Sequence, residues 1–85
     1  MADPQIDPQA WLHPSVWIGS DTVIWGLARI HADVKLGKFC SIGEMTYIGR
    51  GAQIGNHSRF STNCYVVDHI KIGERVFFGP CVVTT

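Results

Sequence analysis

Residues 36–55 have the sequence LGKFCSIGEMTYIGRGAQIG, and this stretch decides the fold. A large aliphatic residue followed by glycine returns every six residues, at Leu36-Gly37, Ile42-Gly43, Ile48-Gly49 and Ile54-Gly55. An α-helix needs a period near 3.6 residues, and glycine at this density destabilises a helix by up to about 1 kcal/mol per residue. The polar pair between these positions also interrupts the two-residue alternation of a long strand. The stretch therefore predicts short strands joined by tight turns.

The six-residue period extends through almost the whole chain without an insertion or a deletion. The first position of each hexad is large and apolar, at Ile6, Leu12, Ile18, Ile24, Ile30, Leu36, Ile42, Ile48, Ile54, Phe60, Val66, Ile72 and Phe78. Leu, Ile, Val and Phe supply only 24 of the 85 residues, so chance gives this pattern with a probability on the order of 10⁻⁶ or less. The fifth positions, apart from Ile70, are small or β-branched. The repeat spans one continuous unit.

Length and charge exclude several classes of protein. Eighty-five residues form one small domain, with seven Lys and Arg against seven Asp and Glu. Nucleic acids and anionic membranes require a concentrated basic face, so neither is an expected partner. No apolar run approaches the ~20 residues of a membrane span, and the start lacks the features of a signal peptide, which predicts a cytoplasmic protein. The three cysteines have no C-x-x-C spacing and are expected to be reduced thiols.

The hexads resemble those of the hexapeptide-repeat family over Ile6 to Val83. This resemblance implies an all-β fold, a left-handed parallel β-helix of a little over four triangular coils with no inserted loops. Residues 6–85 would form this single domain, either complete or truncated at its C-terminus, and residues 1–5 an N-terminal tail. In the family, first and fifth positions point inward, sixth and second positions lie on flat faces, and third and fourth positions form corners.

Counting residues modulo eighteen places an apolar edge on the implied prism. The edge carries Leu27, Met45 and the Tyr47/Tyr65 pair, with Trp25 as a further anchor. An exposed apolar patch on a small protein usually marks an interface, and members of the family are typically trimers. We therefore expect these residues at the contact of a homotrimer. The alternative is that the aromatic residues simply cover the stack of coils.

Two enzymatic classes within the family are compared through their motifs. The γ-class carbonic anhydrases need histidines in an H-x4-H spacing, which His13, His31, His57 and His69 do not provide. The phrases at residues 36–43, 63–68 and 76–80 are similar to those of acetyltransferases acting on amino sugars and sugars carried by nucleotides. That similarity implies acetyl-CoA as the donor, a small sugar as the acceptor and no metal. Both N- and O-acetylation remain open.

Acetyl transfer needs a general base near neutral pKa, and histidine is the obvious candidate. His31, on the predicted interface face, and His69, beside Asp68, are the two candidate catalytic residues. Asn63 and Asp68 match family phrases and are candidate acceptor-binding residues, although Asn63 could instead support a left-handed turn. Gly79 and Pro80 could place the pantetheine arm of the donor or could merely shape a corner.

A second interpretation belongs to another class. Related amino-sugar enzymes have Trp-His-Phe-x-His after the first coil, whereas the matching positions here include Gly26 and Arg29. This departure favours a non-catalytic trimeric scaffold or a truncated acyltransferase fragment. Stacked His13 and His31 could also gather a metal around a threefold axis, although no carboxylate ligand is evident.

Overall fold

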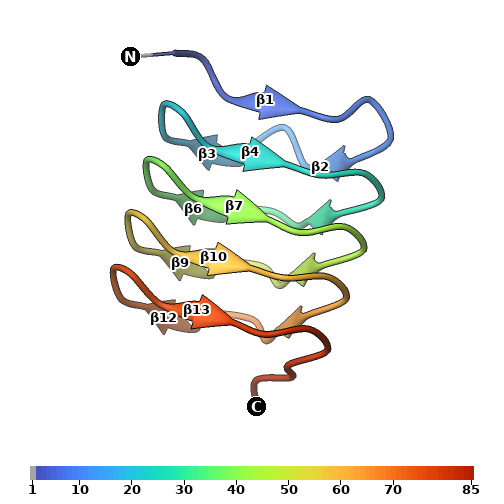
Figure 1. Ribbon diagram of the computed structural model, residues 1–85, viewed down its shortest axis with the longest axis vertical. Helices are drawn as coiled ribbons and strands as arrows, with labels where there is room; N and C mark the ends of the chain where they lie inside the picture. Colours follow the sequence, from blue (N-terminus) through green and yellow to red (C-terminus); the bar gives the residue numbers. More distant parts are fainter. Residues whose placement is uncertain (1) are drawn as a thin grey trace.

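A computed structural model describes residues 2–85, which form a stack of short parallel strands with no helix (Figure 1). Each strand is two residues long and consists of the sixth position of one hexad and the first of the next. The strands are β1 (Gln5–Ile6), β2 (Trp11–Leu12), β3 (Trp17–Ile18), β4 (Val23–Ile24), β5 (Arg29–Ile30), β6 (Lys35–Leu36), β7 (Ser41–Ile42), β8 (Tyr47–Ile48), β9 (Gln53–Ile54), β10 (Arg59–Phe60), β11 (Tyr65–Val66), β12 (Lys71–Ile72) and β13 (Phe77–Phe78).

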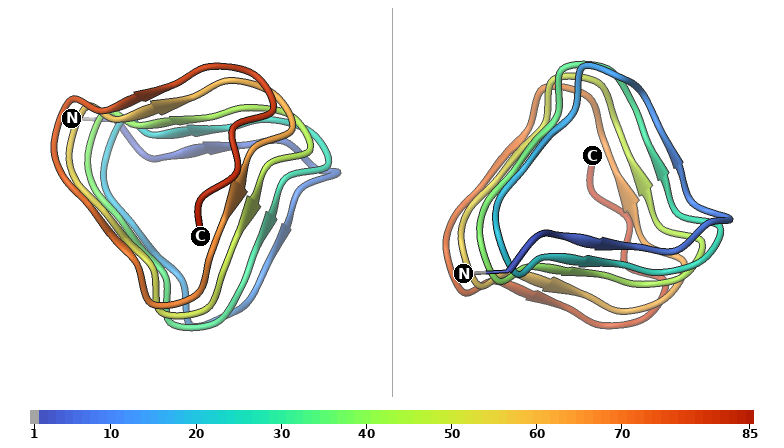
Figure 2. Two further views of the ribbon diagram at one scale, coloured as in Figure 1. Left: turned by 90° about the horizontal axis from the view of Figure 1, so that it is seen from below. Right: turned by 90° about the horizontal axis from the view of Figure 1, so that it is seen from above.

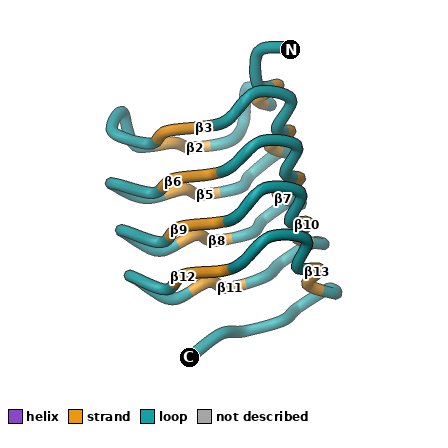
Figure 3. Tube along the Cα trace, turned by 90° about the vertical axis from the view of Figure 1, so that its left-hand side faces the viewer, coloured by secondary structure: helices purple, strands orange, loops and turns teal. Residues whose placement is uncertain are grey.

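The strands form the three faces of a triangular prism. Sheet A has the order β1-β4-β7-β10-β13, sheet B the order β11-β8-β5-β2, and sheet C the order β12-β9-β6-β3. Every pairing is parallel and joins residues eighteen apart, as in Tyr47↔Tyr65 and Lys35↔Gln53. Seen from its N-terminal end the chain turns anticlockwise as it recedes, so the helix is left-handed (Figure 2). The expected fold is confirmed, and the coils lie one above another without an inserted loop (Figure 3).

The core is the inside of the prism, filled by the first and fifth positions. Buried apolar residues are Ile24, Ala28, Ile30, Val34, Leu36, Cys40, Ile42, Ile48, Ala52, Ile54, Phe60, Cys64 and Val66. Three buried hydroxyls, those of Thr22, Thr46 and Ser58, donate to backbone carbonyls of the next coil in the stack. Ile6 is 45% exposed because a coil lies on only one side of it. Burial of this core, which water cannot reach, holds the coils together.

The corners adopt a left-handed backbone conformation that the sequence pattern does not predict. The fourth-position residues have φ near +60° at Asp21, Leu27, Asp33, Phe39, Met45, His57, Asn63, His69, Arg75 and Cys81, and at Gly51. A repeated hydrogen bond accompanies this geometry. The N–H of the fourth position donates to a carbonyl of the preceding coil, as from Met45 to Gly26 (3.2 Å) and from His69 to Arg50 (2.8 Å). The bond to the neighbouring coil stabilises a backbone that bulky residues otherwise avoid.

Candidate functional site

Sheet B carries a ladder of stacked rings on its outer surface. The ring centroids of Trp11 and His31 lie 5.3 Å apart, those of His31 and Tyr47 4.6 Å, and those of Tyr47 and Tyr65 4.7 Å. The guanidinium carbon of Arg29 lies 5.8 Å from the centroid of the Trp11 ring. Trp11, Tyr47 and Tyr65 belong to β2, β8 and β11, and His31 directly follows β5, so side chains from four coils meet on this face. The ladder places His31 in an aromatic, partly dehydrated environment.

His31 has one nitrogen that is cut off from water. Its Nε2 is buried and has no hydrogen-bond partner among the described residues. The adjacent Trp11 and Tyr47 rings offer only the weak acceptor of an aromatic face. A polar atom buried without a partner is costly and calls for an explanation. In this rotamer, Nδ1 is therefore the nitrogen of His31 that can accept or donate a proton.

The phenol of Tyr47 is held in its neutral form. Burial raises the pKa of Tyr47 above its ordinary value of 10.0, and the nearby Tyr65 and Asp68 raise it further. The guanidinium of Arg29 acts in the opposite direction and lowers the pKa. Tyr47 is therefore a hydrogen-bond donor rather than a base at neutral pH.

The Asp68 carboxylate lies against Gly49 and Arg50 of the preceding coil and is not within ion-pair distance of His69. Its Oδ1 accepts a hydrogen bond from the N–H of Arg50 at 3.0 Å and fills the space in which a side chain at Gly49 would stand. Gly49 is aligned with His31 one coil away, since the strands pair Ile30 with Ile48. The only ion pair within residues 2–85 joins Arg75 to Glu74, so Asp68 does not pair with His69.

His69 occupies the corner between sheets B and C. It is exposed, has φ of 62°, and its imidazole Nδ1 lies against Gly51 of the preceding coil. Gly51 has φ of 74°, and a side chain there would enter the space of the His69 ring. Only glycine therefore fits at residue 51 while the ring keeps this position. The corner presents an accessible imidazole without a carboxylate partner.

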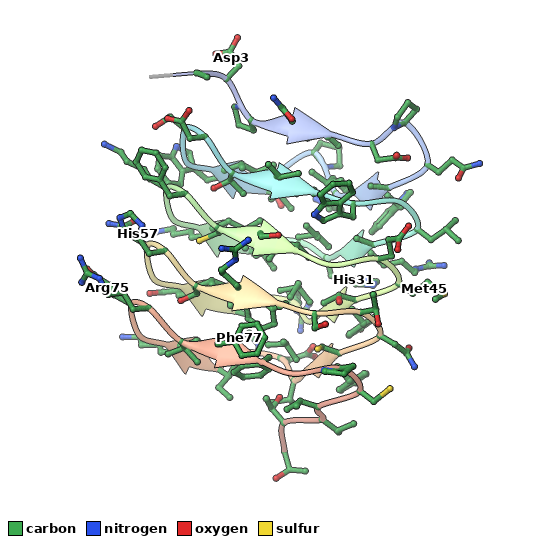
Figure 4. All side chains as sticks on the ribbon, in the orientation of Figure 1. Asp3, His31, Met45, His57, Arg75 and Phe77 are labelled. Atoms are coloured by element: carbon green, nitrogen blue, oxygen red, sulfur yellow. The ribbon has the colours of Figure 1, made fainter. Side chains whose placement is uncertain are left out.

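The corner between sheets A and B carries the predicted apolar edge. Leu27 and Met45 are 56% and 54% exposed, and both have φ near +60°. The side chain of Met45 projects from this corner (Figure 4). Asn63 occupies the next step with φ of 57°, and its side-chain amide donates to Cys81 Sγ at 3.8 Å. The left-handed turn expected as an alternative role for Asn63 is therefore present.

Gly79 and Pro80 lead into the same corner one coil further on. No atom lies within 4 Å of where a Cβ of Gly79 would stand, and Pro80 is exposed. The predicted site residues thus form three groups. His31, Tyr47 and Tyr65 lie on sheet B; Leu27, Met45, Asn63, Gly79 and Pro80 follow one corner; Asp68 and His69 occupy another.

Trp25 stands on sheet A beside a cavity that the sequence pattern did not single out. Its indole Nε1 donates to Ser41 Oγ at 3.3 Å. The cavity is lined by Trp25, Ser41, Gly43, Glu44, Phe60, Ser61 and Thr62. The available signal was the eighteen-residue count, which puts Trp25, Gly43 and Ser61 in one column with the glycine as a gap.

Within residues 2–85 no group of three or more His, Cys, Asp and Glu side chains is arranged to hold a metal ion. His13 Nδ1 lies 2.8 Å from Ser15 Oγ and 3.1 Å from the Ser15 nitrogen. The same part of the chain contains no helix long and apolar enough to cross a membrane.

The hexad repeat is shared with known proteins. The family described as "Bacterial transferase hexapeptide (six repeats)" matches residues 15–50 and 51–85. The "Bifunctional protein GlmU" of Halalkalibacterium halodurans is 34% identical over 76 residues, which are 88% of this chain and 16% of that protein. The protein of the same name from Thermotoga maritima is 34% identical over 73 residues, 80% of this chain and again 16% of that protein. The chain thus spans about a sixth of the length of these relatives.

Two solved structures share the fold at lower identity. A mutant GDP-perosamine N-acetyltransferase from Caulobacter crescentus, in complex with CoA and GDP-perosamine, gives a TM-score of 0.80 at 22% identity over 98% of this chain and 45% of that one. Serine acetyltransferase isoform 3 from Entamoeba histolytica, in complex with cysteine, gives 0.64 at 20% identity over 86% of this chain and 32% of that one. At this identity both describe the fold alone.

Proposed function

Because this chain belongs to the family of bacterial transferases with hexapeptide repeats, we propose that it takes part in acetyl transfer from acetyl-CoA to an amino sugar or sugar of the kind used in surface polysaccharides. The observation that carries the proposal is the match of residues 15–50 and 51–85 to this transferase family. The fold is shared, over 98% of the chain, with a sugar-nucleotide N-acetyltransferase whose structure holds CoA and GDP-perosamine. The acetyltransferase phrases at residues 63–68 and 76–80 support the same reaction class.

The reaction requires few groups. The acceptor nitrogen or oxygen attacks the thioester carbonyl carbon and forms the new C–N or C–O bond. A base takes the acceptor proton, the tetrahedral oxyanion collapses, and the C–S bond breaks to release the CoA thiolate, which is then protonated. The protein must therefore supply a base, a donor for the oxyanion and a surface that holds both substrates.

His31 and His69 are the proposed bases. His31 would act through Nδ1, because its Nε2 is buried against the neighbouring rings. His69 is the more accessible of the two but has no carboxylate to orient it. Asp68 and Asn63 would contact the acceptor, while the backbone at Gly79-Pro80 would border the pantetheine arm.

We place the reaction at the contact between subunits of a homotrimer. Leu27 and Met45 are both exposed and left-handed, a conformation that costs roughly 1–2 kcal/mol for a residue with a Cβ. Burial of the two side chains against a neighbouring copy would offset part of this cost. Trp25, Tyr47 and Tyr65 flank the same edge, so a cleft between copies would border the His31 ladder.

The first experiment is calorimetric titration of acetyl-CoA into protein whose mass has been checked by light scattering. Saturable binding near one donor per subunit supports the proposal, and turnover with amino sugars should follow. His31→Ala and His69→Ala are then tested singly and together, with His57→Ala as the matched control at the third corner. Full turnover in the double variant would exclude both residues as the base.

A non-catalytic trimeric scaffold is the second candidate. The observation favouring it is that no histidine in residues 2–85 lies within ion-pair distance of a carboxylate. An absence of donor binding at millimolar acetyl-CoA, together with a stable trimer, would favour this function over catalysis.

A further inference from the structure

Sheet A carries an open notch beside Gly43. In the column of second-position residues, Gly43 lies between Trp25 on the preceding coil and Ser61 on the following one, since β4, β7 and β10 are adjacent. A side chain at Gly43 would collide with the backbone carbonyls of Ser61 and Phe60. The gap is therefore a fixed consequence of the way the coils pack, and the resulting cavity has a volume of about 310 Å³.

The walls of the notch have a distinct chemistry. On one side stands Trp25, 50% exposed, with its indole oriented by the hydrogen bond to Ser41. Ser41, Ser61, Thr62 and Glu44 are among the lining residues, and most of the lining surface is apolar. Glu44 has no cation within ion-pair distance among the described residues. An oriented aromatic face, three hydroxyl-bearing residues and one acidic residue thus border the notch beside Gly43.

We infer that this notch is a monosaccharide-binding subsite that prefers an amino sugar. The apolar C–H face of a pyranose ring would bury against the indole of Trp25. The ring hydroxyls would exchange hydrogen bonds with Ser41, Ser61 and Thr62, and a protonated amino group would donate to Glu44. The volume lies at the lower end of the roughly 300–1,000 Å³ typical of small-molecule sites.

The notch adjoins the corner that carries Leu27 and Met45, so it would open beside the proposed contact between subunits. The acceptor class rests on the proposed function, whereas the geometry of the notch does not. Sheet C offers a contrast. Its exposed Trp17 stands beside Lys35, and the groove that runs on past Gln53 to Lys71 has no carboxylate among its lining residues. Trp17 therefore provides a matched control for Trp25.

The test is a two-dimensional ¹H–¹⁵N NMR titration of the full chain, which reports the three indole N–H groups separately. The Trp25 signal is assigned with Trp25→Phe. Glucosamine and glucose are the probes, each added to about 100 mM, which saturates a site with a Kd of about 10 mM. We expect the Trp25 signal to shift saturably, with Kd for glucosamine at least roughly threefold lower than for glucose. The Trp17 signal should not move.

Two variants separate the contributions of the walls. Trp25→Ala should weaken the binding of both sugars by about tenfold or more, whereas Trp17→Ala should leave it unchanged. Backbone amide shifts measure binding in these variants. Glu44→Gln should remove the preference for glucosamine and leave glucose binding as it was. Circular dichroism of each variant checks that the fold persists.

An unmoved Trp25 signal at the highest sugar concentration, or sugar binding unaffected by Trp25→Ala, would overturn the subsite. Acetyl transfer with an unchanged KM in Trp25→Ala would do the same while leaving the proposed function intact. Conversely, Trp25-dependent sugar binding in a protein that does not bind acetyl-CoA would support the subsite and contradict the proposed function.

Discussion

Tyr47 and Tyr65 lie face to face across β8 and β11, with ring centroids 4.7 Å apart and planes within 2° of parallel. Their Cα atoms are direct partners in the ladder, so the spacing of the coils sets the spacing of the rings. Burial, followed by electrostatic repulsion from Tyr65 and Asp68, raises the pKa of the Tyr47 phenol, and Arg29 partly opposes the rise. The relationship connects the ladder of sheet B to the pH dependence of the fold.

Tyr47→Phe should flatten the loss of stability at high pH. Because the folded state raises the pKa of Tyr47, its neutral form contributes fully below the unfolded pKa of about 10, and that contribution is lost as pH rises through the folded pKa. Urea denaturation between about pH 8 and pH 12, a range centred on the ordinary phenol pKa of about 10, measures the effect. Equal slopes of unfolding free energy against pH in both proteins would contradict the assignment.

Met45→Asp should dissociate the proposed homotrimer. A carboxylate placed on the apolar corner would have to be desolvated in any subunit contact, and the expected mass by light scattering is that of a single chain. Phe39→Asp is the matched control, because Phe39 is also exposed and left-handed but lies at the corner between sheets C and A. Loss of assembly in the control but not in Met45→Asp would move the interface to that other corner.

The two buried thiols should resist modification. Burial raises the pKa of the Cys40 thiol, and Cys64 is likewise buried, whereas Cys81 is exposed. The thiolate is the reactive species. In the Cys81→Ser variant, the remaining thiols should therefore react with a thiol reagent at least about tenfold more slowly in the folded protein than in the unfolded protein. Absorbance of the released chromophore follows the reaction, and rapid labelling of the folded variant would show that the core opens.

Thr22→Val should destabilise the fold by about 1–3 kcal/mol. The Thr22 hydroxyl donates to the Gly37 carbonyl at 2.7 Å and accepts from the Cys40 N–H at 3.1 Å, and valine leaves both buried groups without a partner. Thr62→Val, at an exposed corner, should change the unfolding free energy by less than about 0.5 kcal/mol. Chemical denaturation compares the two.

Gly51→Ala should cost roughly 1–2 kcal/mol from the left-handed backbone alone, and more from the contact with His69. Adding His69→Ala should recover only the second part, so the two substitutions should be non-additive. Strict additivity in a double-mutant cycle would show that the imidazole does not occupy this space in solution.

The hexad pattern was sufficient to predict the strands and the core, because inward positions must be apolar in every coil. It was insufficient for the corners. Asn63 and Gly51 tolerate a left-handed backbone, but nothing in Leu27, Phe39 or Met45 suggests one, since it arises from a hydrogen bond to the preceding coil. The pattern also could not show that the Asp68 carboxylate turns to Arg50 rather than to His69, because that choice depends on the space above Gly49.

Because residues eighteen apart are stacked on each other, the chain can change in length only by whole coils if its surfaces are to be kept. Inserting one extra hexad after Gly49 would preserve the strands, yet it would rotate everything that follows by a third of a turn. Tyr65 would then leave Tyr47 for another face, and Ser61 would no longer close the notch below Trp25. Only whole coils can be added or removed without dismantling the surfaces, so changes in length must come in steps of three hexads.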